Sequence, residues 1–283
     1  MALASPLTLM DLRGQPAVTL QLPAGDRAVV LLHGAQLVSW CTGGEGAERL
    51  YLSPTALFDG QSAVRGGVPV CFPQFNQRGP MLKHGFARHL PWQLEAGGSA
   101  GEVSFSLRQG TLTQLFWPQA FHVRLTISLR PQALRLALHV ENTGARPWGF
   151  TAALHSYLRV HDVEHVHLGG LEGAQRWDAV SDSRSLQSGA PRFGAEFDSV
   201  YQAPATPLAL TEAGGGRLRV AQSQSFAQTV VWNPGPELGR RLTDLPDADW
   251  RRMLCVEAAV IDTPVQLAPG GAWQGWQHLH WSA

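Results

Sequence analysis

The chain has 283 residues, of which 44% are hydrophobic and 16% charged, and its formal net charge is zero. This composition is typical of a folded globular protein and excludes a disordered one. The balanced charge, without any run of like charges, also argues against a nucleic-acid partner. The three cysteines, Cys41, Cys71 and Cys255, are odd in number and far apart, which fits neither a disulfide framework nor a CxxC zinc site. We expect free, buried thiols.

We expect neither a membrane span nor a signal peptide in this chain. No stretch approaches the ~20 apolar residues of a membrane helix. The N-terminus lacks a positively charged start and is broken by Pro6. We therefore expect a cytoplasmic protein that does not contact a membrane.

Alternation of apolar and polar residues predicts β-strands along most of the chain. In chain order, the predicted strands cover residues 17–22, 28–32, 103–108, 121–130, 133–141, 229–232, 254–261 and 276–281. Pro131 and Gln132 separate the two longest strands, which predicts a hairpin. The glycine-rich segments 96–102 and 212–218 are predicted hairpin tips or strand connections, and a short helix is expected at residues 247–252.

Helical patterns are scarce and alternating βα units are absent, so the fold class is all-β, a large antiparallel β-sandwich with few short helices. No repeat, linker or low-complexity tract divides the chain. We expect a single domain over residues 1–283.

Three segments concentrate residues that could carry chemistry. Residues 64–92 combine glycine, proline and aromatic residues with basic side chains, a composition of rigid loops rather than of regular strands. Residues 150–173 place His155 after an apolar strand, on the same face as Tyr157. In residues 253–262, Glu257 lies within an apolar strand, where a carboxylate needs either a cationic partner or a function.

These segments resemble the D-hexose-6-phosphate mutarotases (glucose-6-phosphate 1-epimerases) of the aldose 1-epimerase superfamily. The stretches that carry the resemblance are RGGVPVCFPQF, HGFARHLPW, LHSYLRV, GLEG, VVWNP and MLCVEAA. Several motifs that agree in order are more specific than one short pattern. The resemblance implies a galactose-mutarotase-like β-sandwich that needs no metal or organic cofactor, and a small-molecule sugar phosphate as its partner. We expect a monomer.

The resemblance also assigns the site. His155 is the implied proton donor and Glu257 the implied proton acceptor in the opening and closing of the sugar ring. The ligand-contacting positions fall on Arg65, His84 and Arg88, with the arginines near the phosphate, and Asp198 corresponds to an acid that meets sugar hydroxyls.

One position departs from the pattern. Lys83 stands where many members have glutamine, so a side chain that donates and accepts is replaced by a cation that only donates. Lys83 is nevertheless a candidate for the substrate site, as a third cation beside Arg65 and Arg88. We expect His155 and Glu257 to flank one cleft, about a sugar ring's width apart.

Three alternatives remain open. The chain could be a mutarotase of free aldoses. It could be a metal-dependent jelly-roll enzyme, because His161, His165 and His167 share strand parity and His278 and His280 form a similar pair. It could also be a non-catalytic sugar-binding sandwich, because ten tryptophans supply aromatic faces that stack on sugar rings.

Overall fold

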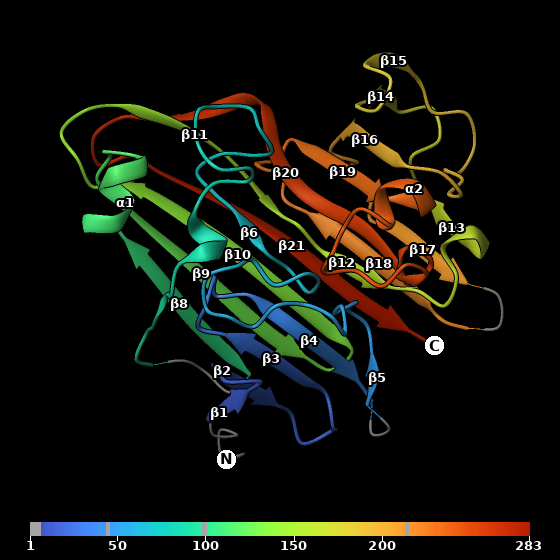
Figure 1. Cartoon of the computed structure of the whole chain (residues 1–283), viewed down its shortest axis with the longest axis horizontal. Helices are drawn as coiled ribbons and strands as arrows, with labels where there is room; N and C mark the ends of the chain where they lie inside the picture. Colours follow the sequence, from blue (N-terminus) through green and yellow to red (C-terminus); the bar gives the residue numbers. More distant parts are fainter. Residues whose placement is uncertain (1–6, 44–45, 98–100, 213–214) are drawn as a thin grey trace.

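The alternating segments form three antiparallel sheets in the computed structural model, which describes residues 7–43, 46–97, 101–212 and 215–283 (Figure 1). A five-stranded sheet is formed, in spatial order, by β1 to β5, which are Thr8–Leu12, Gln15–Gln21, Arg27–Leu31, Leu37–Thr42 and Ala47–Glu48. It lies at the bottom of the view in Figure 1.

Two larger sheets have eight strands each. The first has the order β13-β17-β18-β21-β10-β9-β8-β7, with bounds Val166–Gly169, Leu208–Glu212, Arg217–Gln222, Ala272–Ser282, Ala133–Asn142, Phe121–Arg130, Glu102–Arg108 and Gln93–Leu94. The second has the order β15-β14-β16-β19-β20-β11-β6, with bounds Ser183–Leu186, Gln175–Asp178, Phe197–Gln202, Gln228–Asn233, Met253–Leu267, Trp148–Leu154 and Val70–Cys71. Its remaining strand, β12 (Tyr157–Arg159), pairs with β20.

The helices in the described part of the chain are short. They are α1 (Thr111–Phe116), α2 (Gly235–Gly239) and the 3₁₀ turns η1 (Ala87–His89), η2 (Val163–His165) and η3 (Asp249–Arg252). In the part of the chain that the structure describes, no helix has the length and apolar character needed to span a membrane.

The predicted fold class is confirmed, as is the hairpin around Pro131 and Gln132, whose strands are β9 and β10. The glycine-rich segments connect the paired strands β7–β8 and β17–β18, although residues 98–100 and 213–214 of these segments lie outside the described residues. The helix expected at residues 247–252 is the 3₁₀ turn η3. The three cysteines are free and buried. The single-domain organisation stays a prediction.

The main apolar core draws buried side chains from both eight-stranded sheets, which overlap in the view of Figure 1. On β20, Val256 and Ala258 belong to this core, whereas Ala259 and Ile261 belong to a smaller apolar cluster. Since successive side chains of a strand point to opposite faces, Glu257 shares the face of Ala259 and points away from the main core. Both faces of this strand are thus buried around Glu257.

The loop after β6 folds back so that its residue Gly85 lies beside Phe72 at its beginning. Phe72 packs edge-on against Trp117 and Phe121, and its backbone forms a bridge with Gly85. His84, the preceding residue, has a φ of +67°, an unusual backbone conformation for a residue with a side chain. Gly85 has a φ of +71°, and a Cβ atom there would collide with the Phe72 carbonyl. The close approach of the two segments therefore requires glycine.

We predict that Gly85→Ala destabilises the fold and displaces His84. Gly14→Ala is the matched control, because Gly14 has a similar φ of +82° but an added Cβ would meet nothing within 4 Å. Both variants carry the backbone strain of about 1–3 kcal/mol, and only Gly85→Ala adds the collision. Thermal unfolding should give a melting temperature lower for Gly85→Ala than for Gly14→Ala. Equal melting temperatures would refute the close-approach argument.

Candidate functional site

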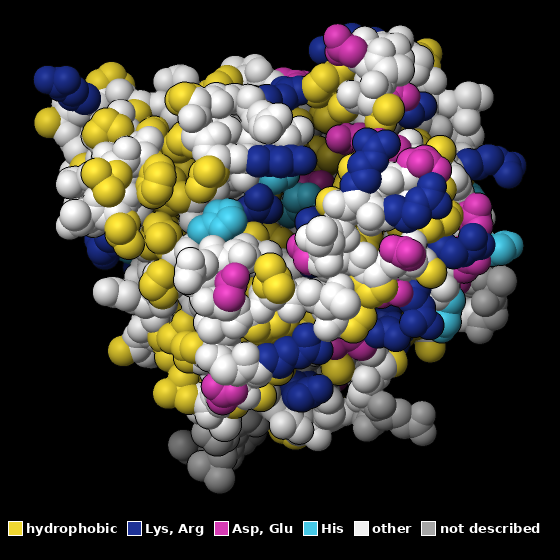
Figure 2. All heavy atoms as spheres, viewed as in Figure 1, with side chains coloured by type: hydrophobic (Ala, Val, Ile, Leu, Met, Phe, Trp, Pro, Cys, Tyr) yellow, Lys and Arg dark blue, Asp and Glu magenta, His cyan; other side chains and the backbone are white. Residues whose placement is uncertain are grey.

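A cavity of about 190 Å³ opens beside Glu257, on the face of its sheet opposite the main core. Figure 2 shows a hollow near the centre of the molecular face, where histidine and basic side chains gather around an acidic one. The cavity is lined by Arg65, Phe75, Asn76, Lys83, His84, Arg88, His155, Tyr157, Glu196, Asp198, Val230, Trp232, Leu238, Leu242 and Glu257. It therefore brings together all seven site residues expected from the sequence.

Strand register explains how distant residues reach this cavity. Glu257 on β20 is paired with Val230 on β19, and Trp232 on β19 is paired with Asp198 on β16. Directly opposed residues of antiparallel strands point to the same face. Tyr157 joins them because it is paired with Cys255, two residues before Glu257. The floor of the cavity is thus one continuous patch of a four-strand surface.

His155 lies between β11 and β12, where its backbone N–H donates to the carbonyl of Pro69 at 3.0 Å. Its ring stacks on Tyr157, with centroids 4.9 Å apart and planes inclined by 12°, which confirms that the two residues share a face. Its Nε2 lies 3.4 Å from Oε1 of Glu257. The expectation of a sugar ring's width between the two side chains is therefore wrong: neighbouring strands place them in direct contact.

Burial dominates the electrostatics of this pair. Glu257 is 1% exposed and His155 is 7% exposed. Loss of hydration raises the pKa of Glu257 well above its ordinary value and lowers the pKa of His155 well below its own. Both shifts favour the neutral form of each group, in which the pair's proton is on the carboxyl group. The ion pair, with that proton on the imidazole, has the same total charge.

Three residues of the cavity carry buried polar atoms that no described residue satisfies. These atoms are Nδ1 of His155, Oε2 of Glu257 and Nε of Arg88. A buried polar atom without a hydrogen bond is costly and rare in folded proteins. The three residues line the same small cavity, which suits a polar ligand.

His84 is held as a neutral donor. Its Nδ1 accepts the backbone N–H of Asn76 at 3.2 Å and lies 3.3 Å from the Cys71 thiol. The proton of the neutral ring is therefore on Nε2. Burial, together with the nearby His155, lowers the pKa of His84 and keeps the ring uncharged.

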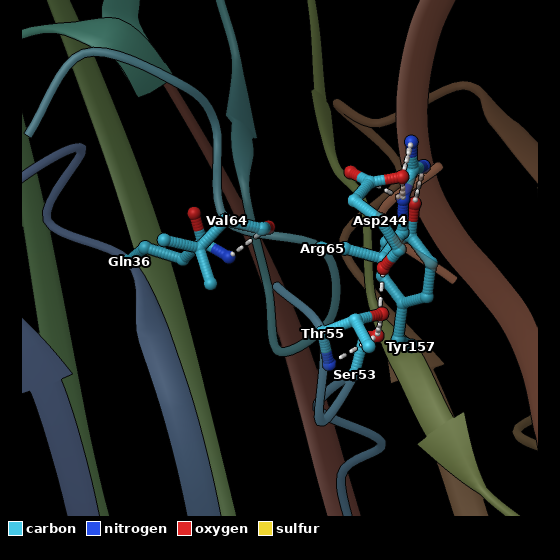
Figure 3. A network of polar contacts seen from close by, with 7 residues as sticks. All are labelled: Gln36, Ser53, Thr55, Val64, Arg65, Tyr157 and Asp244. Carbon is cyan, nitrogen blue, oxygen red and sulfur yellow. Dashed lines mark hydrogen bonds and ion pairs between the residues drawn. The ribbon is translucent and has the colours of Figure 1, made fainter. Parts of the chain in front are cut away.

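Arg65 is already paired (Figure 3). Its Nε lies 3.2 Å from both carboxylate oxygens of Asp244, its Nη2 lies 3.1 Å from one of them, and its Nη1 donates to the Tyr157 hydroxyl at 3.0 Å. Burial raises the pKa of Tyr157, so its hydroxyl keeps a proton. Gln36 donates to the carbonyls of Val64 and Gly66 on either side of Arg65, which fixes the backbone there. Arg65 therefore orients the Tyr157 hydroxyl, and its positive charge is already paired with Asp244.

The other two cations of the cavity, Arg88 and Lys83, differ in how firmly the protein holds their side chains. Arg88 donates from Nη2 to the carbonyl of Lys83 at 2.8 Å, which holds the guanidinium against the loop. The Lys83 residue is exposed. Asp198 on β16 also lines the cavity, and its burial, aided by Glu196, raises its pKa to about 6. Arg88 is therefore the best-positioned anchor for an anion.

The histidines that suggested a metal site do not converge. Residues 163–165 form the turn η2, where Asp162 accepts the N–H of Glu164, so the strand parity assumed for this segment fails. His161 pairs with Glu212, and His165 with Asp162. Among the residues that the structure describes, no group of three or more histidine, cysteine or acidic side chains could hold a metal ion.

Sequence reasoning did not assign Trp232, Glu196, Tyr157 or Asp244 to the site, although it placed Tyr157 on the face of His155. Trp232 and Glu196 line the cavity, Tyr157 stacks on His155, and Asp244 pairs with Arg65. The motif VVWNP contains Trp232 and could have indicated it. No local signal marks Asp244, which lies 179 positions from Arg65 in the chain.

Residues 16–280 match the family model described as aldose 1-epimerase. A protein of Cenchrus ciliaris with the provisional name glucose-6-phosphate 1-epimerase is 33% identical over 88% of this chain and 79% of its own length. An Escherichia coli K12 protein with the same provisional name is 35% identical over 82% of this chain and 79% of its own.

Solved structures agree with these matches. The crystal structure of YeaD from Salmonella typhimurium, provisionally described as a mutarotase, has a TM-score of 0.88 and 28% identity, covering 98% of this chain and 93% of its own. The structure of HI1317 has a TM-score of 0.79 at 22% identity, covering 100% and 98% of the two chains, and shows the likeness of fold alone.

We predict that Glu257→Gln gains stability relative to the wild type as the pH rises. In the wild-type protein the buried pair retains one proton, whereas unfolded Glu257 loses its proton above its ordinary pKa of about 4.3. Because the folded pKa of Glu257 is raised, the contribution of Glu257 to the free energy of unfolding falls with increasing pH, by up to about 1.4 kcal/mol per unit. The lowered pKa of His155 acts in the opposite direction, but His155 is present in both proteins and its contribution cancels in their difference. The glutamine of the variant is neutral throughout and has no such loss.

The measurement is the difference in unfolding free energy between Glu257→Gln and the wild type, from denaturant titrations at about pH 5 to 8. We expect the advantage of the variant to grow with pH across this range. A difference that is constant with pH would show that Glu257 is not held with a raised pKa.

Proposed function

The chain belongs to the aldose 1-epimerase family, and from that premise we propose that it interconverts the α and β anomers of a hexose 6-phosphate, with His155 and Glu257 as the catalytic pair. The substrate class is taken from the names of the relatives, glucose 6-phosphate being the first choice. The observation that carries the catalytic proposal is the contact of 3.4 Å between two buried, titratable side chains at a small polar cavity.

Ring opening requires two proton transfers. A base removes the proton of the anomeric hydroxyl while an acid protonates the ring oxygen, and closing reverses both roles after the aldehyde has turned its other face. Both oxygens are bonded to the anomeric carbon in the closed ring. Two groups in contact with each other can therefore serve both oxygens, which agrees with the close approach of His155 and Glu257.

The pair must hold its proton on His155 at the start of ring opening. Proton transfer from Glu257 to His155 across their contact produces this form without exchange with solvent, because the total charge is unchanged. The positive charges of Arg88 and Lys83 oppose protonation of His155. A bound phosphate dianion would offset them and favour the imidazolium.

The remaining lining residues orient the sugar in this proposal. Arg88, with its buried and unpartnered Nε, anchors the phosphate, and Lys83 adds an exposed charge. His84 donates from Nε2, and Asp198 accepts from sugar hydroxyls. Trp232, whose ring meets that of His155 edge-on at 6.0 Å, gives the sugar an apolar wall.

One observation favours a second candidate, the mutarotation of free aldoses. Asp244 already neutralises Arg65, which leaves Arg88 and Lys83 as the cations available to a phosphate. We expect no metal or organic cofactor to be needed in either case. A cytoplasmic location, a monomeric state and the absence of a nucleic-acid partner all stay predictions, and the free, buried thiols support the first.

We predict faster anomer exchange with glucose 6-phosphate than with glucose, measured by NMR exchange between the anomeric proton signals. In Arg88→Ala, KM for glucose 6-phosphate should rise by roughly tenfold or more, because a hydrogen bond to a charged group contributes about 1.5–3 kcal/mol. The rate with glucose should hardly change. Lys83→Gln should raise KM only a few-fold, because its flexible ammonium is exposed.

Arg146→Ala is the control for loss of one positive charge, since Arg146 is exposed and does not line the cavity. It should behave as the wild type with both sugars. Equal kcat/KM values for glucose and glucose 6-phosphate in the unmodified protein would assign it to free aldoses. No acceleration with either sugar would contradict the proposed activity itself.

A further inference from the structure

A second and larger cavity, of about 560 Å³, lies apart from the catalytic one and shares no lining residue with it. Its lining residues come from β5, β12, β17, β18, η3 and β21 and from the segments next to them. It is lined by Gly46, Ala47, Glu48, Arg49, Arg159, Val160, His161, Leu210, Glu212, Gly215, Gly216, Leu218, Arg252 and Trp281. Its volume is within the range of small-molecule sites.

The two acidic side chains of this cavity, Glu48 and Glu212, are occupied by the protein itself. Oε1 of Glu48 accepts three backbone N–H groups at 2.8–3.1 Å, those of Trp40, Arg49 and Leu50. Its Oε2 accepts the Ser39 hydroxyl at 2.5 Å. The Glu48 carboxylate is therefore a poor partner for a further cation.

Glu212 is used in the same way. Its Oε1 accepts the backbone N–H of His161 at 2.6 Å, and its Oε2 lies 3.1 Å from the His161 ring. Neither Glu48 nor Glu212 forms an ion pair with an arginine of the cavity within the described ranges.

Three guanidinium groups remain. Arg49 donates from Nε to the Thr42 hydroxyl at 2.8 Å and lies over the Trp281 ring, 3.5 Å from its centroid, which leaves its two Nη groups available. Arg159 and Arg252 are exposed, and in the described part of the chain their side chains have no hydrogen-bond or ion-pair partner. Three planar donors around one concave space suit an anion with several oxygens.

From this lining we propose that the second cavity binds a phosphorylated small molecule, with its phosphate on Arg49, Arg159 and Arg252 and its body against Trp281 and the apolar side chains Leu210 and Leu218. This site is additional to the proposed catalytic one and does not depend on it. A sugar phosphate and a nucleotide share the required chemistry, so the test includes both.

Strand β12 contributes Tyr157 to the catalytic cavity and Arg159 to the second one. The binding measurement must therefore distinguish a ligand in one cavity from a ligand in the other. Each cavity contains one tryptophan, Trp232 in the catalytic cavity and Trp281 in the second. Their indole N–H signals, assigned from Trp232→Phe and Trp281→Phe in ¹⁵N-labelled protein, report the two sites separately. The protein is titrated with inorganic phosphate, glucose 6-phosphate and ADP.

We expect at least one of these probes to shift the Trp281 signal in a saturable manner below about 10 mM. In Arg159→Ala/Arg252→Ala the dissociation constant from this signal should rise at least tenfold, while the Trp232 response to glucose 6-phosphate stays unchanged. Arg146→Ala/Arg192→Ala, which removes two exposed arginines outside both cavities, should leave both responses unchanged.

Equal affinity for the three probes would show that the phosphate group alone is recognised. Tighter binding of glucose 6-phosphate or of ADP would show whether the cavity prefers a sugar or a nucleoside attached to the phosphate. Both outcomes support the site. A Trp281 signal that no probe shifts would overturn the proposal. So would a shift that persists unchanged in Arg159→Ala/Arg252→Ala.

Discussion

The contact between His155 and Glu257 is the constraint around which the site is arranged. Two titratable groups lie 3.4 Å apart and almost wholly out of water, and the pKa of each is displaced toward its neutral form. Such a pair costs stability that an apolar pair of similar size would not cost. The presence of Glu257 in the middle of an apolar strand, in contact with His155, is explained by proton transfer, for which two adjacent groups sharing one proton are well suited.

The fold supports this pair by burying both faces of one sheet. The side of β20 that carries Val256 packs on the main core, and the side that carries Glu257 is covered by the loop after β6 and by α2. The loop can approach the strand closely because Gly85 has no side chain, and this approach places His84 beside His155, with ring centroids 5.4 Å apart. A rigid sheet therefore provides the catalytic pair, and loops provide the groups that would orient the ligand.

Strand alternation in the sequence was enough to predict the fold class and the long hairpin β9–β10, because each of these strands has one apolar and one polar face. It could not predict the full extent of β20, which continues to Leu267 beyond the predicted end at residue 261. It also failed around His161 and His165, where the capping contact of Asp162 produces a turn.

The residues of the site were predicted through motifs, and all seven line one cavity. Their pairing could not be predicted, because it depends on strand register and on contacts between distant segments, and the distance between His155 and Glu257 was mispredicted for this reason.

The most direct test of the account is the rate of anomer exchange in Glu257→Gln and His155→Ala, measured by NMR with glucose 6-phosphate at equal concentrations of folded protein. If the pair moves both protons, each variant should lose about 10²- to 10⁴-fold in rate, with circular dichroism unchanged. Exchange near the wild-type rate in either variant would contradict the role assigned to that residue and, with it, the claim that the buried pair is retained for catalysis.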